Sequence, residues 1–349
     1  MKRIVTCSDG TWNKPGVETK GQIVATNVQK LFATVCKVMS PADGSEPIHQ
    51  IKYYDEGVGA EGTAWSKLID GATGAGIDDN IKDIYRFIVW NYEPGDELFL
   101  FGFSRGAYTA RSLVGLIRNC GILINNDLTL INTAYDIYRD RDDPKKNPNG
   151  EISTAFRAKH SHPDTSIKFV GVWDTVGALG IPVRAFQFLN KNQYQFHDTT
   201  LSSIVENAYQ ALAVEEERSN FQPALWTIDP TKPLPTGQTM KQVWFSGVHS
   251  NVGGGYPDHG LSDLTLKWMS DQARSCGLGF DEPQLASYTA TADITGELYN
   301  SNGFPFSLLA AYVRPVMKTT GANESIDPSV FERMRLVSGY EPKNIDKPS

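Results

Sequence analysis

A serine lies between two glycines in the stretch DELFLFGFSRGAYTAR, residues 96–111. A serine hydroxyl is a weak nucleophile, and G-x-S-x-G hydrolases expose it on a sharp turn between a strand and a helix. Gly102-Phe103-Ser104-Arg105-Gly106 matches this pattern, with an apolar run before it and a helical pattern after it. The glycines let neighbouring backbone pass close by, and a helix start favours negative charge. The pattern therefore predicts a catalytic nucleophile, Ser104, rather than a purely structural turn.

The base that would activate this serine is expected among six histidines. His249 directly follows a predicted core strand in WFSGVHSNVGGGY, whose three consecutive glycines allow tight packing around a site. His259 follows ten residues later in YPDHGLSD, and spacing alone does not exclude it. The remaining histidines have less suitable positions, in a polar loop, before a strand or in an aromatic segment: His160, His162, His49 and His197. We predict His249 as the general base, with His259 as its competitor.

The third member of such a triad is a carboxylate that orients the imidazole and stabilises its cation. Asp174 directly follows an apolar strand in FVGVWDTVG. A carboxylate in that position is costly unless it is paired, although it could also cap the following turn. The chain order Ser104, Asp174, His249 is the order found on α/β-hydrolase sheets. This order favours the catalytic interpretation.

An oxyanion hole needs two convergent backbone N–H groups. The first is expected from Arg105, the residue after the nucleophile. The second is expected from the end of an earlier strand, where CSDGTWN offers Gly10 and Thr11. We expect the Asp9 side chain to hold this loop in place.

Three other kinds of site have less support in the sequence. SDGTWN resembles the D-x-D-G-T motif of haloacid-dehalogenase-type phosphatases, but Cys7 stands where their nucleophilic aspartate would be. The glycine-rich GVGAEG lacks the acidic ribose partner of a dinucleotide site. A metal site would have to combine Asp9, Asp174, His249 and Asp258. No histidine pair at ligand spacing on a strand or helix supports it, so we expect neither metal nor cofactor.

Short apolar runs bounded by turn residues alternate with helical patterns along the chain. Strands are predicted at 3–9, 47–59, 97–104, 166–177 and 241–255, and helices at 76–96 and 106–121. The alternation predicts an α/β protein with an α/β-hydrolase-like fold. Its central sheet is expected to be mostly parallel and covered by helices on both faces, because continuous apolar strands are buried on both sides.

The predicted domain organisation follows from the same pattern. A catalytic domain is expected over residues 1–280, with a helical, aromatic-rich insert at about 180–225 that forms a lid or cap. Residues 281–349 are expected to pack on the same domain as a C-terminal extension with a flexible tail.

Charge and cysteine content exclude several classes of protein. The net charge of the 349 residues is −7 and no dense Lys/Arg cluster occurs, so a nucleic-acid partner is not expected. A local patch could still make a transient contact with a membrane surface. The four cysteines are dispersed, as free thiols are.

We expect no signal peptide, because the amino-terminal apolar run is short, and no apolar run approaches the ~20 residues that span a bilayer. We therefore expect synthesis in the cytoplasm, while export without a signal peptide stays open. The sequence does not predict the oligomeric state.

Six blocks together resemble one family, the DUF2235 group of α/β hydrolases, which includes the catalytic domains of type VI secretion lipase effectors called Tle1. The blocks are CSDGTWN (7–13), YYDEGVGA (53–60), GIDDNIKDIYRFIVWNYEPGDELFLFGFSRGAYTARSLVGLI (76–117), FVGVWDTVGALG (169–180), ALAVEEERSNFQPALW (211–226) and WFSGVHSNVGGGYPDHGLSDLTLKWM (244–269). The resemblance implies a serine esterase with nucleophile Ser104, acid Asp174 and base His249. It favours a phospholipase of the A type, with a lipid ester as substrate.

The chain departs from the family pattern at two positions near these blocks. Asn251 stands where the family often has aspartate, and we expect it to support the site or the substrate. Gln210 stands where the family often has histidine. Substrate preference therefore stays open between a lipid ester and a small soluble ester. The resemblance also implies a secretion-system or immunity partner, and the alternative from another class is a non-catalytic interaction protein on the same fold.

Overall fold

The computed structural model describes most of the chain. The described residues are 1–10, 16, 18–19, 21–41, 43–57, 76–125, 127–140, 142–176, 200–219, 221–228, 231, 234–301 and 311–346.

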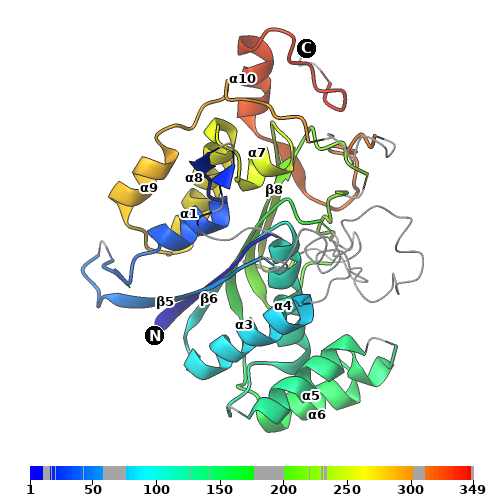
Figure 1. The fold of residues 1–349 in the computed structure, drawn as a ribbon. Helices are drawn as coiled ribbons and strands as arrows, with labels where there is room; N and C mark the ends of the chain where they lie inside the picture. The colour runs from blue at the N-terminus through cyan, green and yellow to red at the C-terminus, as the bar shows by residue number, and fades with distance from the viewer. Residues whose placement is uncertain are drawn as a thin grey trace.

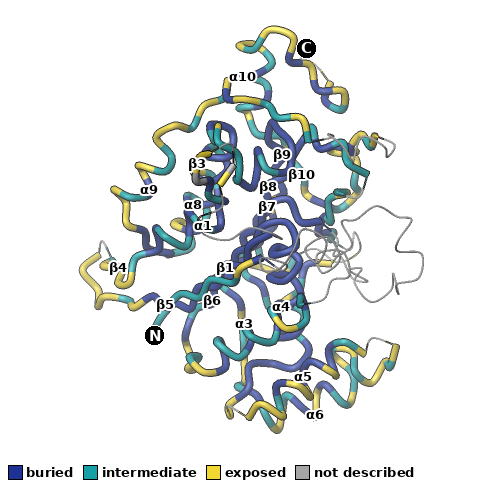
Figure 2. Tube along the Cα trace, viewed as in Figure 1, coloured by how far each residue is buried: buried dark blue, intermediate teal, exposed yellow. Residues whose placement is uncertain are grey.

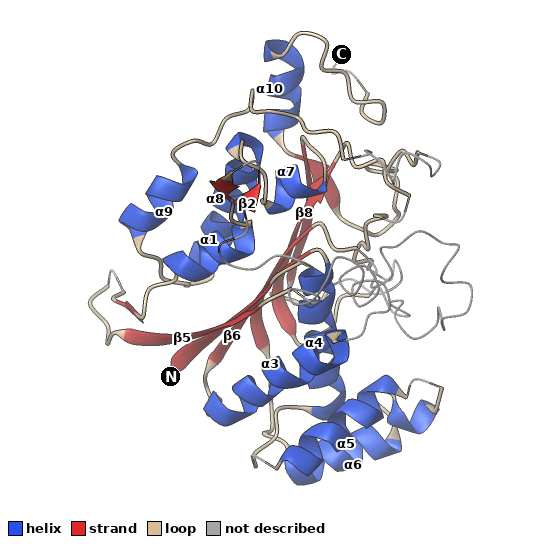
Figure 3. Ribbon diagram, viewed as in Figure 1, coloured by secondary structure: helices blue, strands red, loops and turns tan. Residues whose placement is uncertain are grey.

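An eight-stranded sheet crosses the centre of the molecule (Figure 3). In spatial order its strands are β10 (Glu324–Ile326), β9 (Thr239–Phe245), β8 (Val205–Ala213), β7 (Ile167–Trp173), β6 (Glu97–Phe103), β1 (Lys2–Ser8), β5 (Ile48–Asp55) and β4 (Val38–Met39). Neighbouring strands are parallel, except that β4 is antiparallel to β5. A second, two-stranded sheet consists of β2 (Glu18–Thr19) and β3 (Gln22–Ile23). The predicted α/β-hydrolase-like class with a mostly parallel sheet is confirmed.

Helices cover both faces of the large sheet (Figure 1). One face carries α3 (Ile77–Asn91), α4 (Arg105–Cys120), α5 (Leu128–Arg139), the short η1 (Pro144–Lys146) and α6 (Glu151–His160). The other carries α1 (Asn27–Thr34), α7 (His249–Gly253), α8 (Gly260–Ser275) and α9 (Glu282–Thr289), while α10 (Pro328–Leu336) lies beside β10. In the part of the chain that is described, no helix is both long enough and apolar enough to cross a bilayer.

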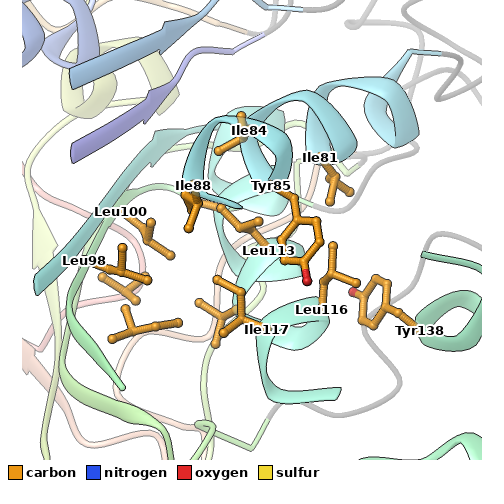
Figure 4. Packing of buried hydrophobic residues seen from close by; sticks show 14 of the residues in the cluster. Ile81, Ile84, Tyr85, Ile88, Leu98, Leu100, Leu113, Leu116, Ile117 and Tyr138 are labelled. Carbon is orange, nitrogen blue, oxygen red and sulfur yellow. The ribbon is translucent and has the colours of Figure 1, made fainter. Parts of the chain in front are cut away.

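The central strand β6 explains why its sequence is continuously apolar. Leu98 and Leu100 point into the core shared with α3 and α4, where Figure 4 shows them beside Ile88, Leu113 and Ile117. Phe99 and Phe101 are equally buried and pack into the core on the opposite face. Because side chains alternate along a strand, a strand covered on both faces needs apolar residues at every position. Figure 2 shows the buried sheet between the two helical layers.

The predicted helical insert at 180–225 is wrong in its second half. Residues 177–199 lie outside the described part of the chain, but residues 205–213 form β8, which pairs in parallel with both β7 and β9. No helix occurs within the described residues between 200 and 228. Gln210 obscures the strand pattern in the sequence. Its amide is satisfied inside the sheet, where it accepts from Thr175 Oγ1 at 2.5 Å and donates to the carbonyl of Ala224 at 3.1 Å.

The C-terminal part of the chain belongs to the same layers. β10 extends the sheet, and Val316, Val330 and Ile345 share a core with residues of β8 and β9. The expected flexible tail is wrong for residues 339–346, because its apolar groups are buried. The Tyr340 hydroxyl lies in hydrogen-bond contact with Glu215 and with Ser246 Oγ.

The sheet order places a ligand site at one edge. β5 and β6 both follow β1 in the chain but lie on opposite sides of it, so the strand order reverses there. In open α/β sheets, ligands bind outside the carboxyl ends of the strands at such a reversal. Asp9, Ser104 and Asp174 immediately follow β1, β6 and β7 at this edge.

Candidate active site

Ser104 occupies a sharp turn between β6 and α4. Its backbone has φ 58° and ψ −120°, an arrangement that non-glycine residues adopt at a cost and that clusters at functional sites. The Ser104 N–H donates to the carbonyl of Trp173 at 3.0 Å, which ties the turn to the end of β7. The sharp strand-to-helix turn predicted at Ser104 is therefore present in the backbone.

The two glycines of the motif are required by close backbone contacts. A Cβ built at Gly106 would lie well under 3 Å from the backbone carbonyls of Ser8 and Asp9, at the end of β1. A Cβ at Gly102 would similarly meet the backbone of Gly106 and Ala107. The first turn of α4 thus packs directly on the strand ends, and this contact fixes the position of Ser104.

We expect Gly106→Ala to displace the elbow. The methyl group would collide with backbone, which cannot rotate away, so the variant should lose about 3 kcal/mol of unfolding free energy. Gly115→Ala in the same helix is the matched control, because the atoms nearest to its Cβ belong to the Tyr138 side chain, from 2.9 Å, and not to backbone. It should cost less than Gly106→Ala, since a side chain can shift and alanine favours a helix. Urea unfolding of both variants measures the difference, and equal losses would contradict the close contact at Gly106.

Asp174 and His249 form a buried pair at the adjacent strand end. His249 Nδ1 lies 2.5 Å from Asp174 Oδ2, and the two side chains are 6% and 0% exposed. Asp174 itself has a left-handed φ of 40°, and its Oδ1 accepts the N–H of Ala213 at 3.1 Å. The His249 ring lies 4.6 Å from the Phe103 ring, centroid to centroid, beside the residue that precedes Ser104. The structure thus brings the three predicted triad residues to the same sheet edge.

An arginine that sequence reasoning missed completes the environment of Asp174. Arg314 Nη1 donates to Asp174 Oδ1 at 2.6 Å, and Nη2 donates to Oδ2 at 3.0 Å. Both side chains are fully buried. The signal that could have found it is a lone cation in the apolar stretch AYVRPVM, since a buried cation requires a buried partner.

Glu216 supports the base from a second side. Its Oε2 accepts the backbone N–H of His249 at 3.2 Å, and its Oε1 pairs with Arg218 Nε at 2.8 Å. The ring of Phe221 meets the His249 ring edge-on at 5.0 Å. On the far side, Gly253 is needed because a Cβ there would collide with the Phe103 ring.

The protonation of the pair follows from these contacts. Burial alone would raise the pKa of Asp174, but the charge of Arg314 and the bond to His249 outweigh it and hold that pKa below its usual range. Burial lowers the pKa of His249; the Asp174 charge opposes this, and the nearby Arg218 adds to it. Asp174 is therefore an anion and His249 a neutral imidazole at neutral pH, as a general base must be.

The lowered pKa of His249 predicts an acid-tolerant reaction. A base works only when it is unprotonated, and a pKa below the ordinary value of about 6.5 keeps it so to lower pH. We expect the acid limb of kcat/KM for a soluble ester to be centred below pH 6.5. A pH profile between pH 4.5 and 8, with thermal melts at each pH to verify folding, measures this. An acid limb centred above pH 7 would contradict it.

The structure describes two of the three predicted oxyanion donors, Arg105 and Gly10. The N–H of Arg105 belongs to the first turn of α4, where the helix dipole favours negative charge. Burial lowers the pKa of the Arg105 side chain to about 9. The N–H of Gly10 donates instead to Asp9 Oδ1 at 2.6 Å. It is therefore not free to bind an oxyanion, and the prediction of Gly10 as an oxyanion donor is wrong. Thr11 lies outside the described residues.

Asp9 and Asn251 hold the surrounding loops. Asp9 Oδ2 accepts from Thr26 Oγ1 at 2.6 Å and from the Tyr54 hydroxyl at 2.8 Å, which joins the end of β1 to α1 and β5. Asn251 Nδ2 donates to the carbonyl of Glu297 at 2.9 Å, which fastens α7 to the loop after α9. Both side chains are engaged in holding the backbone near the site.

His259 has a different carboxylate partner. Its Nδ1 lies 2.6 Å from Asp263 Oδ2, and Asp263 Oδ1 accepts Lys30 Nζ at 2.6 Å. Asp174 pairs with His249 and not with this competitor. Among the described residues, no group of three or more His, Cys, Asp or Glu side chains could hold a metal ion.

Comparisons with known proteins identify the family of this chain. A family model described as the catalytic domain of the Tle1-like phospholipase effectors of type VI secretion matches residues 2–272. The uncharacterized protein YEL023C of Saccharomyces cerevisiae is 29% identical over 251 residues, which are 66% of this chain and 34% of the yeast protein.

Two solved structures are similar at lower identity. An uncharacterized protein from Pseudomonas aeruginosa is 17% identical with a TM-score of 0.43, over 82% of this chain and 47% of that one. The Tle1 effector bound to the VgrG spike of the type 6 secretion system is 17% identical with a TM-score of 0.41, over 73% and 51%. The chain thus spans about a third of the yeast protein and about half of each solved chain.

Proposed function

We propose that this chain, which belongs to the family of Tle1-like catalytic domains of type VI secretion phospholipase effectors, is a serine hydrolase of carboxylic esters. One observation carries the proposal: a serine on a left-handed strand-to-helix turn lies at the same sheet edge as a buried His–Asp pair. The turn holds Ser104, which is 8% exposed, at the end of β6, and the pair supplies a neutral, oriented base.

The proposed reaction has two steps. Ser104 Oγ attacks the ester carbonyl while His249 takes its proton; Asp174 occupies Nδ1, so Nε2 is the accepting atom. The imidazolium then protonates the leaving alcohol, and an acyl-enzyme remains. In the second step His249 takes a proton from water, the resulting hydroxide attacks the acyl carbonyl, and Ser104 leaves with its proton restored. The Asp174 anion stabilises the imidazolium in both steps.

The negative oxygen of each tetrahedral intermediate requires backbone donors. We propose the N–H of Arg105 as the first, at the positive end of α4. The second is proposed from the loop after β1, at Thr11, since the Gly10 N–H is bonded to Asp9.

Family membership favours a lipid or phospholipid ester as substrate over a small soluble ester. A lipid substrate implies a transient contact with a membrane surface, and the type VI effector family implies a secretion-system or immunity protein as partner. Both are proposals for the whole protein, because the chain spans only part of its relatives' length.

Ester hydrolysis by wild-type protein tests the proposal. We expect cleavage of p-nitrophenyl esters from acetate to palmitate and release of fatty acid from phospholipid vesicles. We also expect stoichiometric labelling by a fluorophosphonate, which reacts only with an activated serine. A rise in kcat/KM with chain length would favour the lipid substrate, and a maximum at acetate the soluble one. No cleavage and no labelling would instead leave a non-catalytic interaction protein.

A further inference from the structure

A buried arginine from a distant part of the chain contacts Asp174, the acid of the proposed triad. Arg314 lies 140 residues after Asp174 and outside the residues 2–272 that the family model matches. Besides its two bonds to the carboxylate, its Nη1 donates to the carbonyl of Ala213 at 2.8 Å and its Nη2 to the carbonyl of Phe221 at 2.6 Å. The guanidinium is thus fixed by four bonds, and all four acceptors belong to the site's own strands and loops.

The bidentate geometry constrains the carboxylate in a way that a single bond could not. One nitrogen meets each oxygen of Asp174, so the plane of the carboxylate is set by the plane of the guanidinium. Oδ2 is also the oxygen that meets His249 Nδ1. The direction of the His249 ring therefore depends on a side chain that does not touch the imidazole.

The charges around His249 are balanced by the same residue. The groups that face it are two carboxylates, of Asp174 and Glu216, and two guanidiniums, of Arg218 and Arg314. Asp174 would stabilise a protonated His249 strongly if its charge were not shared. Arg314 is bound to both oxygens of Asp174, so its charge opposes that stabilisation and adds to the burial that lowers the pKa of His249.

We propose that Arg314 is a positioning residue of the ester hydrolysis proposed above: it holds the Asp174 carboxylate in the plane that His249 requires and balances its charge. The C-terminal segment thus contributes a positioning residue to the site, although the three proposed triad residues all precede this segment in the chain.

The test compares the wild type with Arg314→Gln, using a soluble ester between pH 4.5 and 8. Removal of the cation leaves one net negative charge beside His249, so its proton is held more tightly. We expect the acid limb of kcat/KM to move up by about one pH unit or more. The loosened carboxylate should also lower kcat by about 10²-fold. Arg314→Lys keeps the charge without the fork, so it should keep the wild-type acid limb and give an intermediate kcat.

Arg333→Gln is the matched control. Arg333 is also a buried arginine of the C-terminal segment, but its guanidinium donates to the carbonyls of Ile294 and Gly296 and not to Asp174. Its loss should lower thermal stability and leave the acid limb in place. An unchanged acid limb in Arg314→Gln, with activity reduced only as stability is, would overturn the positioning role. If Arg314→Gln does not fold, Arg314→Lys decides: a kcat equal to that of the wild type overturns the proposal, and a reduced kcat at unchanged KM supports it.

A readout without turnover separates this proposal from the proposed function. The His249 ring can be titrated by NMR in the resting protein, with its signal assigned through His249→Asn. We expect its pKa to rise in Arg314→Gln and to stay put in Arg333→Gln. If the wild type cleaves no ester but this rise occurs, the ester-hydrolase proposal fails while the charge balance stands. If the wild type is active and the pKa does not move, the role of Arg314 fails alone.

Discussion

Ser104→Ala should lower kcat/KM by about 10³-fold or more and abolish labelling by a fluorophosphonate. The loss is large because alanine removes the atom that forms the acyl-enzyme, while the base and the oxyanion donors then have no nucleophile to assist. The turn has φ 58°, and alanine tolerates this backbone angle about as well as serine does. The variant should therefore fold, with a thermal midpoint close to that of the wild type.

Ser8→Ala is the matched control for this experiment. Ser8 is a buried serine at the carboxyl end of the adjacent strand, opposite Gly102 in the β1–β6 register. Its Oγ has no hydrogen-bond partner among the described residues, and no step of the mechanism uses it. Esterase assays of both variants should show loss for Ser104→Ala alone. Retained cleavage in Ser104→Ala would exclude the serine mechanism, and equal loss in both would indicate general damage to the strand ends.

The strand-to-helix turn at Ser104 could be predicted because its determinants are local. The apolar run of β6, the two glycines and the helical pattern of α4 are adjacent in sequence, and each element needs only its neighbours to be recognised. The glycines prove necessary because backbone atoms of the elbow and of β1 lie within collision distance of any Cβ. The positions of Asp174 and His249 could also be predicted, since each follows an apolar strand; their catalytic roles stay predictions.

β8 could not be predicted from the sequence because it contains polar residues, and their hydrogen-bond partners lie in other segments of the chain. The amide of Gln210 bonds to Thr175 and to the carbonyl of Ala224, and it also contacts Gln242 in the next strand. In isolation such a segment lacks the continuous apolar character of a central strand. Its place in the sheet is decided by tertiary pairing with β7 and β9, which outweighs local propensity.

Arg314 was missed for a related reason. Its role depends on an ion pair that joins two segments far apart in the chain, and no spacing rule connects them. The strand that precedes Asp174 can thus be predicted from the sequence, whereas its ion-pair partner Arg314 can be identified only in the folded structure.

Asp174→Asn should both inactivate and destabilise the protein, and a second substitution should separate the two effects. Asparagine cannot stabilise the imidazolium, so we expect kcat to fall by about 10³–10⁴-fold. It also leaves the fully buried guanidinium of Arg314 without a counter-ion, which should cost about 3–5 kcal/mol of unfolding free energy.

In Asp174→Asn/Arg314→Met both charges are removed, so no buried cation is left unpaired. We expect the double variant to regain most of the lost unfolding free energy, since well-packed apolar replacement of a buried ion pair is often neutral. Activity should remain as low as in Asp174→Asn, because the acid is still missing. Urea unfolding at neutral pH completes the double-mutant cycle with Arg314→Met alone. Additive stability losses would mean that the pair is not coupled, and recovered activity would remove Asp174 from the mechanism.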